Sequence, residues 1–124
     1  MAKKVLVLDD DEGILEGFKA MLESEGYDVS TSTDPYHLQS IPASQYPDLI
    51  LLDVLLSGED GREVCKILKK HKSIRKIPLL MMSAALNMEQ SVLEAGADGF
   101  LKKPFEMDEM LRIIDAHVNK VGKS

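Results

Sequence analysis

The sequence predicts an α/β fold, a three-layer, doubly wound (βα)5 sandwich built on a five-stranded parallel sheet. Five short apolar runs alternate with segments of helical period along the 124 residues, which is the pattern of repeated βαβ units. Three of these runs are apolar at consecutive positions, as strands are when helices cover both faces of their sheet. Right-handed crossovers between the parallel strands then place helices on both sides.

The five expected strands are short and are separated by helical or turn segments. They are Val5–Leu8, Tyr27–Ser30, Leu49–Leu52, Leu79–Met82 and Gly99–Leu101. Apolar residues at spacings of three and four predict helices after the first, third and fifth strands. These stripes are Ile14, Phe18, Met21 and Leu22; Val64, Ile67 and Leu68; and Met107, Met110, Leu111, Ile114, Val118 and Val121.

The two remaining helices have weaker patterns. One is expected after Asp34-Pro35, because Asp caps helices and Pro suits the first helical position. The other is expected over residues 88–95 and ends at Gly96, while Gly26 ends the first helix of the chain.

Composition limits the function classes. The chain carries 15 Lys and Arg against 21 Asp and Glu, a net charge of −6, which argues against direct nucleic acid binding because phosphates require a basic surface. Its length corresponds to a single domain over residues 1–124. The one cysteine, Cys65, excludes an intramolecular disulfide and a Cys-based zinc cluster. No run approaches the ~20 apolar residues of a membrane span and no signal peptide is recognisable, so we expect a cytoplasmic protein without membrane contact.

Polar residues follow four of the five predicted strands. Each has a structural explanation by itself, since acids favour helix N-termini and Asp commonly ends a strand. Ligands of open parallel sheets, however, bind at the carboxyl ends of the strands, so the joint pattern predicts a functional site at that edge. The residues are Asp9, Asp10, Asp11 and Glu12 after the first strand, Asp53 after the third, Ser83 after the fourth and Lys103-Pro104 after the fifth.

This set of side chains predicts a site for a divalent cation and a phosphoryl group. Three neighbouring carboxylates repel one another unless a cation or a lysine neutralises them, and hard oxygen ligands suit Mg²⁺. A lysine and a hydroxyl on the opposite side match the remaining oxygens of a phosphoryl group. Acids stand where a glycine-rich nucleotide loop would follow the first strand, so a bound nucleotide phosphate would be repelled. The phosphoryl group is therefore expected to be transferred to a carboxylate of the protein.

Five motifs in order and at compatible spacing, covering residues 4–120, give the sequence a specific resemblance. The chain resembles the response-regulator receiver domain of two-component signal transduction, which has a chemotaxis-regulator-like fold. The resemblance implies the flavodoxin-like strand order 2-1-3-4-5 and a cis Lys103-Pro104 bond. The motifs are Val7-Leu8-Asp9-Asp10-Asp11-Glu12, Leu51-Leu52-Asp53-Val54, Met82-Ser83-Ala84-Ala85, Gly96-Ala97-Asp98-Gly99-Phe100 and Lys102-Lys103-Pro104-Phe105.

The resemblance implies a chemical role for each residue of the acidic cluster. Asp53 would be the phosphoacceptor, an in-line nucleophile toward the phosphohistidine of a histidine kinase or phosphotransfer protein. Asp10, Asp53 and the backbone carbonyl of Leu55 would bind Mg²⁺ directly, with Asp9 holding a metal-bound water. Lys103 would pair first with the carboxylate and then with the phosphoryl oxygens. Such a domain catalyses only its own phosphorylation and dephosphorylation and is not a turnover enzyme.

The resemblance also implies an output surface. Ser83 would be the switch hydroxyl and Phe100 the aromatic residue that reorients with it, which alters the surface of the fourth helix, fifth strand and fifth helix. A downstream protein target, a covalently linked output domain outside these residues, or a second copy in a phosphorylation-dependent homodimer would bind there. Both a complete single-domain regulator and a domain of a longer regulator or hybrid kinase are consistent with the sequence.

Three features depart from the family or tune it. Ser57, followed by Gly58, stands where the family usually has proline, which predicts a more mobile loop. Phe100 lacks the hydroxyl that a tyrosine would use to hold one rotamer. By resemblance, the side chains two residues after Asp53 and Ser83 hold the water that hydrolyses the acyl phosphate. Here they are Leu55 and Ala85, which cannot hydrogen-bond a water, so the phosphorylated form is expected to decay slowly.

Two other functions are compatible with parts of the pattern. A haloacid-dehalogenase-type phosphatase also uses an Asp nucleophile and Mg²⁺, and Asp9-x-Asp11 resembles its motif, but the chain lacks a cap and a later acidic pair. A phosphorylation-independent scaffold would require a broken site, and no motif is lost. Leu15, at the edge of the first helical stripe, is equally compatible with the core and with partial exposure for kinase docking.

Overall fold

A five-stranded parallel sheet organises the computed structural model, which describes residues 2–56, 58–104 and 106–122. The strand order is β2-β1-β3-β6-β7, which is the predicted order 2-1-3-4-5 when only the strands of this sheet are counted. The predicted fold class is therefore confirmed. The strands are β1 (Lys4–Leu8), β2 (Asp28–Ser32), β3 (Leu49–Asp53), β6 (Leu79–Ser83) and β7 (Gly99–Lys102).

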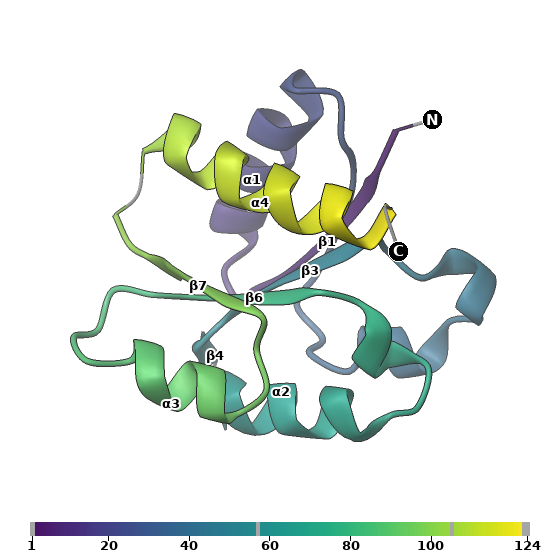
Figure 1. Ribbon diagram of the computed structural model, residues 1–124. Coiled ribbons are helices and arrows are strands. Elements are labelled where there is room, and N and C mark those ends of the chain that lie inside the picture. The colour runs from purple at the N-terminus through teal and green to yellow at the C-terminus, as the bar shows by residue number, and fades with distance from the viewer. Residues whose placement is uncertain (1, 57, 105, 123–124) are drawn as a thin grey trace.

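Helices cover both faces of the sheet (Figure 1). The helices α1 (Glu12–Ser24) and α4 (Met107–Gly122) lie on one face, and α2 (Gly61–Lys70) and α3 (Glu89–Glu94) lie on the other. Side chains alternate along β1 and β3, so each face has its own apolar core. Leu6, Leu8, Ile50 and Leu52 pack with α2 and α3, whereas Val5, Val7, Leu49 and Leu51 pack with α1 and α4.

The helix ends follow the capping signals of the sequence. The Asp11 carboxylate accepts hydrogen bonds from the backbone N–H groups of Gly13 (2.8 Å) and Ile14 (3.2 Å), which caps α1. Past the end of α1, Gly26 has a φ of 92°, and Gly96 beyond α3 has a φ of 107°. Glycine tolerates these left-handed conformations without steric cost, so both helices end where predicted.

The predicted second helix is wrong. The residues after Asp34-Pro35 form two short 3₁₀ turns, η1 (His37–Ser40) and η2 (Ala43–Gln45). The Asp34 carboxylate accepts a hydrogen bond from the N–H of Tyr36 (2.9 Å) and so closes a turn of its own. Ile41 is extended (φ −117°, ψ 154°), as the residue before a proline prefers, and Pro42 ends the first turn. The fold thus has four α-helices among the described residues.

Two helical stripes are rotated from their predicted phase. In α1, Leu15 is buried, with 4% of its surface exposed, whereas Ile14 is 38% exposed. The open question on Leu15 is therefore settled in favour of the core. In α2, Cys65 is buried and Ile67 is exposed. The side chain of Val121, together with Ser57 and Phe105, lies outside the described residues.

Two short segments complete the chain. The strands β4 (Leu55–Leu56) and β5 (Glu59–Asp60) form a two-stranded antiparallel ladder directly after β3, and the 3₁₀ turn η3 (Ile74–Lys76) leads from α2 into β6.

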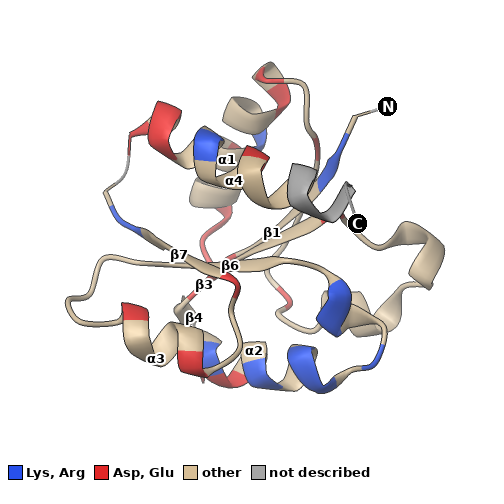
Figure 2. Ribbon diagram, in the orientation of Figure 1, with Lys and Arg blue, Asp and Glu red and all other residues tan. Residues whose placement is uncertain are grey.

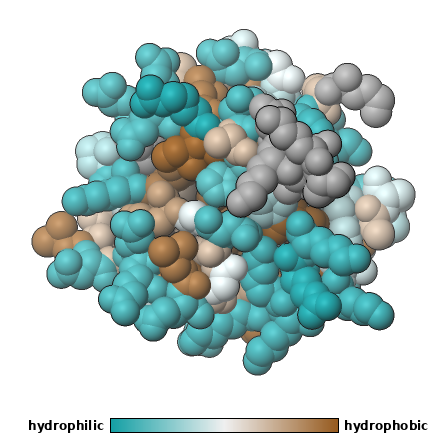
Figure 3. Space-filling model, viewed as in Figure 1, coloured by the Kyte–Doolittle hydropathy of each residue, from teal (hydrophilic) through white to brown (hydrophobic). Residues whose placement is uncertain are grey.

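Lys and Arg gather along α2 and η3, while acidic residues stand at the start of α4 (Figure 2). The face in Figure 3 is mostly hydrophilic, with small apolar patches that are separated from one another. Among the described residues, no helix has the length and apolarity to cross a membrane.

Candidate functional site

The predicted site residues stand at the carboxyl edge of the sheet because the strands are parallel and in register. Asp53, the last residue of β3, pairs with Met82 of β6, and Ser83 pairs with Lys102 of β7. Backbone hydrogen bonds continue past the strand ends, from Val54 N–H to the Met82 carbonyl (2.9 Å) and from Lys103 N–H to the Ser83 carbonyl (2.9 Å). These bonds fix the backbone from which the polar side chains project.

An ion pair between Asp53 and Lys103 forms the centre of the site. The Lys103 Nζ lies 3.1 Å from Asp53 Oδ2 and 4.0 Å from Asp9 Oδ2. The other oxygen of Asp53, Oδ1, accepts a hydrogen bond from the N–H of Leu55 (3.2 Å). Asp53 is 7% exposed, so its carboxylate is nearly buried at the carboxyl edge of the sheet but still contacts solvent. The bond between Lys103 and Pro104 is cis, as predicted.

Asp9 is the electrostatically unfavourable member of the cluster. It is 1% exposed; its Oδ1 accepts a hydrogen bond from the N–H of Asp11 (3.0 Å), and its Oδ2 is buried without a hydrogen bond. Burial raises the pKa of the Asp9 carboxyl to about 7, and the neighbouring Asp53 carboxylate adds to the increase. A second cation close to Lys103 would stabilise both ionised carboxylates. This buried, unsatisfied oxygen therefore fits a divalent cation with hard oxygen ligands.

Two of the predicted metal ligands belong to exposed residues. Asp10 is exposed and lines a shallow hollow with Asp11 and Thr33, and Leu55 is 67% exposed. Among residues 2–56, 58–104 and 106–122, no three Asp, Glu, His or Cys side chains converge closely enough to hold a metal ion. The ligand set of Asp10, Asp53 and the Leu55 carbonyl therefore stays a prediction.

The predicted switch residues occupy neighbouring strands. Ser83 is 1% exposed, and its Oγ accepts a hydrogen bond from the N–H of Ala85 (3.0 Å) in the loop that follows β6. Phe100 is half-buried on β7 and packs against the core shared with α2 and α3. A hollow lies beside it, lined by Ala85, Asn87, Met88, Glu89, Gln90, Phe100 and Lys102. An aromatic side chain next to an open hollow has space in which to change its rotamer.

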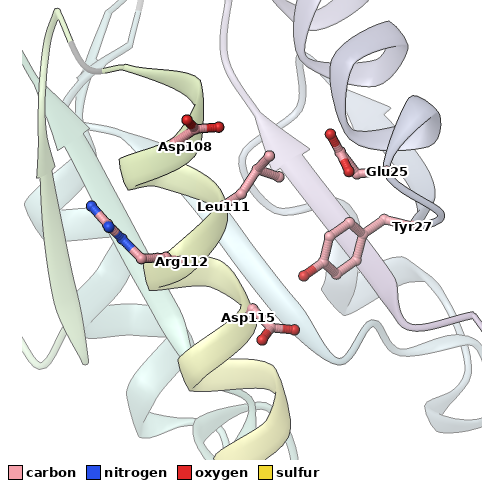
Figure 4. Close-up of a pocket in the computed structure, with 6 residues that line it drawn as sticks. All are labelled: Glu25, Tyr27, Asp108, Leu111, Arg112 and Asp115. Atoms are coloured by element: carbon pink, nitrogen blue, oxygen red, sulfur yellow. The ribbon is translucent and has the colours of Figure 1, made fainter.

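A separate concavity lies away from this edge, between α4 and the turn from α1 into β2 (Figure 4). None of the predicted site residues contributes to it. Its lining residues are Glu25, Tyr27, Asp108, Leu111, Arg112 and Asp115. Burial, and next the Asp115 carboxylate, raise the pKa of the Tyr27 hydroxyl.

Sequence reasoning missed one group of contacts near the site. Arg62, at the start of α2, reaches Ser91 of α3, which lies 29 residues farther along the chain. No local pattern predicts such a contact, because it depends on how α2 and α3 pack side by side on the sheet.

Comparison with known proteins identifies the family. The sequence pattern of the response regulator receiver domain matches residues 5–115. The chain therefore belongs to the response regulator receiver domain family, and it is a receiver domain of the kind found in two-component systems. The sequence-based prediction of the family is confirmed.

Individual relatives show where such domains occur. The DNA-binding dual master transcriptional regulator RpaA of Synechocystis sp. is 34% identical over 122 residues, a match that covers 97% of this chain and 51% of the relative. The chain thus spans about half the length of that relative. The signal receiver domain of a signal transduction histidine kinase from Syntrophus aciditrophicus has a TM-score of 0.87 and 27% identity, covering 99% of this chain and 95% of its own. The chemotaxis response regulator CheY4 of Vibrio cholerae has a TM-score of 0.82 and 27% identity, covering 94% and 99%.

Proposed function

We propose that this receiver domain accepts a phosphoryl group on Asp53. The observation that carries the proposal is the nearly buried Asp53 carboxylate, which lies 3.1 Å from the Lys103 ammonium and beside the buried Asp9. An oxygen of Asp53 attacks the phosphorus of a phosphohistidine in line with the leaving nitrogen. The P–N bond breaks, an acyl phosphate forms, and the imidazole leaves with a proton from solvent.

Positioning and charge neutralisation account for the chemistry. The Leu55 N–H holds one oxygen of Asp53, which leaves the other for attack, and Lys103 moves from the carboxylate to the incoming phosphoryl oxygens. Receiver domains generally depend on Mg²⁺; held by Asp10, Asp53 and the Leu55 carbonyl, with Asp9 acting through a water, it would neutralise charge on the phosphoryl oxygens. The domain modifies only itself and does not turn over a substrate.

The partners follow from this chemistry. We infer that the donor is a histidine kinase or a phosphotransfer protein and that the setting is the cytoplasm. The output surface consists of α3, β7 and α4, with Ser83 and Phe100 as its switch. A downstream protein target, a linked output domain or a second copy would read it. The net charge of −6 argues against direct contact of this domain with nucleic acid.

Phosphorylation with a small-molecule phosphodonor and intact-mass measurement test the proposal. We expect one acid-labile phosphoryl group per chain in the presence of Mg²⁺, and none in Asp53→Asn. Asp28→Asn, which changes an exposed carboxylate at the opposite end of the strands, serves as the matched control and should behave like the wild type. Continuous release of phosphate from a phosphomonoester would instead support the phosphatase alternative, and undiminished labelling of Asp53→Asn would refute the assignment of the acceptor.

The switch is tested by amide chemical shifts with and without a beryllofluoride phosphoryl mimic. Movement of Ser83 toward the phosphoryl oxygens vacates space that Phe100 can fill, so the shifts should cluster in α3, β7 and α4. Ser83→Ala should reduce the shifts of Phe100 while leaving those next to Asp53. Shifts restricted to the two 3₁₀ turns after β2 would contradict this assignment.

A further inference from the structure

Arg62 connects the beginning of α2 with the beginning of α3. Its Nη1 donates a hydrogen bond to Ser91 Oγ (3.2 Å) and lies 3.8 Å from Met88 Sδ. Its Nε and Nη2 donate to the Asp60 carboxylate, at 3.0 Å to Oδ1 and 2.5 Å to Oδ2. Because one planar guanidinium makes all of these contacts, the position of Ser91 relative to Asp60 is fixed by it. We call these contacts the Arg62 bridge.

The α2 end of the bridge is anchored to the phosphoacceptor strand. Asp60 caps α2 by accepting a hydrogen bond from the Arg62 N–H (2.9 Å), and the Arg62 hydrogen bond lowers the pKa of the Asp60 carboxyl. Gly61, between them, donates to the Val54 carbonyl (2.7 Å) and packs so closely that a Cβ would overlap the Asp53 carbonyl oxygen. The backbone of Asp53 and Val54 is therefore in direct contact with the α2 end of the Arg62 bridge.

The α3 end of the bridge contacts a short helix whose start has no side-chain cap. The helix α3 has six residues, and Met88, at its N-cap position, makes no side-chain capping hydrogen bond. Ser91 Oγ donates to the Met88 carbonyl (3.0 Å), so the Arg62 contact reaches the first turn itself. Helices this short depend on tertiary contacts for their stability.

We propose that Arg62 is a positioning residue that couples the phosphorylation state of Asp53 to the position of α3. The bridge holds α3 in the arrangement in which Lys103 contacts the free Asp53 carboxylate. Movement of the backbone around Asp53 on phosphorylation strains the bridge, and its release frees α3. This route runs along the α2 side of the sheet and is distinct from the Ser83–Phe100 switch. The inference rests on the proposed phosphorylation of Asp53.

Hydrogen exchange of the unphosphorylated protein tests the bridge without reference to phosphorylation. Arg62→Lys retains a charge opposite Asp60 but cannot reach both Asp60 and Ser91, so exchange of α3 amides should rise about threefold to tenfold, the effect of losing one hydrogen bond of ordinary net strength. Ser91→Ala should do the same, and the double variant should add little, since both changes remove one contact. Lys66→Gln is the control, because it breaks an exposed pair with Glu63 on the same helix.

The rate of labelling by the small-molecule phosphodonor tests the coupling. If the bridge opposes the phosphorylated arrangement, Arg62→Lys should be labelled about threefold to tenfold faster than wild type, and Lys66→Gln at the wild-type rate. Faster exchange in α3 with unchanged labelling would reduce Arg62 to a structural residue and overturn the coupling. Unchanged exchange would overturn the bridge. Failure of the wild type to be labelled would refute the proposed function, while the exchange result would still decide whether the bridge exists.

Discussion

The residues around Asp53 are arranged so that one cation cannot satisfy two carboxylates. Lys103 contacts Asp53 at 3.1 Å and stands 4.0 Å from Asp9, whose second oxygen has no hydrogen bond. The ionised Asp9 carboxylate is unfavourable in its buried position unless further positive charge is bound beside it. Such a carboxylate is suited to binding a cation and does not stabilise the fold by itself. The sequence alone indicated repulsion among the acids, and the structure identifies Asp9 as the residue that bears it.

We expect the lifetime of the proposed acyl phosphate to depend on Leu55. Its side chain is 67% exposed and cannot hydrogen-bond a water, so the predicted slow decay rests on the absence of a group that positions the attacking water. Leu55→Asn supplies an amide beside Asp53 and should accelerate decay of the phosphorylated form about threefold to tenfold. The measurement is loss of label after the donor is removed, with Leu55→Ala as the control that removes bulk without adding a polar group. Equal decay in Leu55→Asn and wild type would show that this side chain does not set the rate.

Cys65 should make the free energy of unfolding depend on pH in the alkaline range. Burial raises the pKa of its thiol to about 11, so the folded state favours the neutral form. Its contribution to the free energy of unfolding is complete below pH 9 and is lost as the pH rises from 9 to 11. A shift of this size corresponds to about 3 kcal/mol at most. Denaturant titrations should show a smaller decline over that range in Cys65→Val than in wild type, and identical slopes would contradict the burial argument.

At the scale of elements, two glycines in helices should respond oppositely to the same substitution. A Cβ on Gly61 would lie 2.9 Å from Val54 Cα and overlap the Asp53 carbonyl, so Gly61→Ala should destabilise the fold by about 2 kcal/mol or more. A Cβ on Gly17, in the interior of α1, meets nothing within 4 Å. Gly17→Ala should therefore stabilise by about 0.5–1 kcal/mol, because glycine is a poor helix former. Thermal melts of the two variants check both signs.

The elements also show what could be predicted from the sequence. The strands were predicted because three of the five are runs of consecutive apolar residues. The position of the polar residues that follow them was predicted because the carboxyl ends of parallel strands meet at one edge of the sheet. The second helix was predicted wrongly because Asp34 serves a turn as readily as a helix cap, and Pro42 follows too soon for a second helical turn. Helix phase was misjudged at Ile14 and Leu15 because adjacent apolar residues leave the buried face ambiguous by one position.

The candidate site was predictable in composition but not in geometry. That Asp53 and Lys103 meet follows from the topology of a parallel sheet, although 50 residues separate them. Which acid is buried does not follow, because Asp9 and Asp10 are identical neighbours beyond the end of β1, where the course of the backbone decides that Asp9 is buried and Asp10 exposed. The Arg62 bridge was unpredictable for a different reason, since it depends on the lateral packing of two helices that are far apart in the sequence.

At the scale of the whole molecule, Mg²⁺ should stabilise the fold through the acidic cluster. A cation that binds only the folded state adds RT ln(1 + [Mg²⁺]/Kd) to the free energy of unfolding, about 1.4 kcal/mol at ten times Kd, or roughly 5 °C in the melting temperature. The effect should exceed that of an equal ionic strength of NaCl, because screening of surface charge does not reach the buried Asp9 oxygen.

Asp10→Asn should reduce the Mg²⁺-dependent increase in the melting temperature. Because Asp10 is exposed, it should leave the metal-free melting temperature nearly unchanged, whereas removal of the buried Asp9 charge in Asp9→Asn should raise it. Thermal melts of the three proteins in millimolar MgCl₂ and in matched NaCl provide the measurement. An Mg²⁺ response that is equal in wild type and Asp10→Asn would exclude Asp10 from the ligand set, and the absence of any response beyond that of NaCl would argue that the cluster does not bind Mg²⁺ without a phosphoryl group.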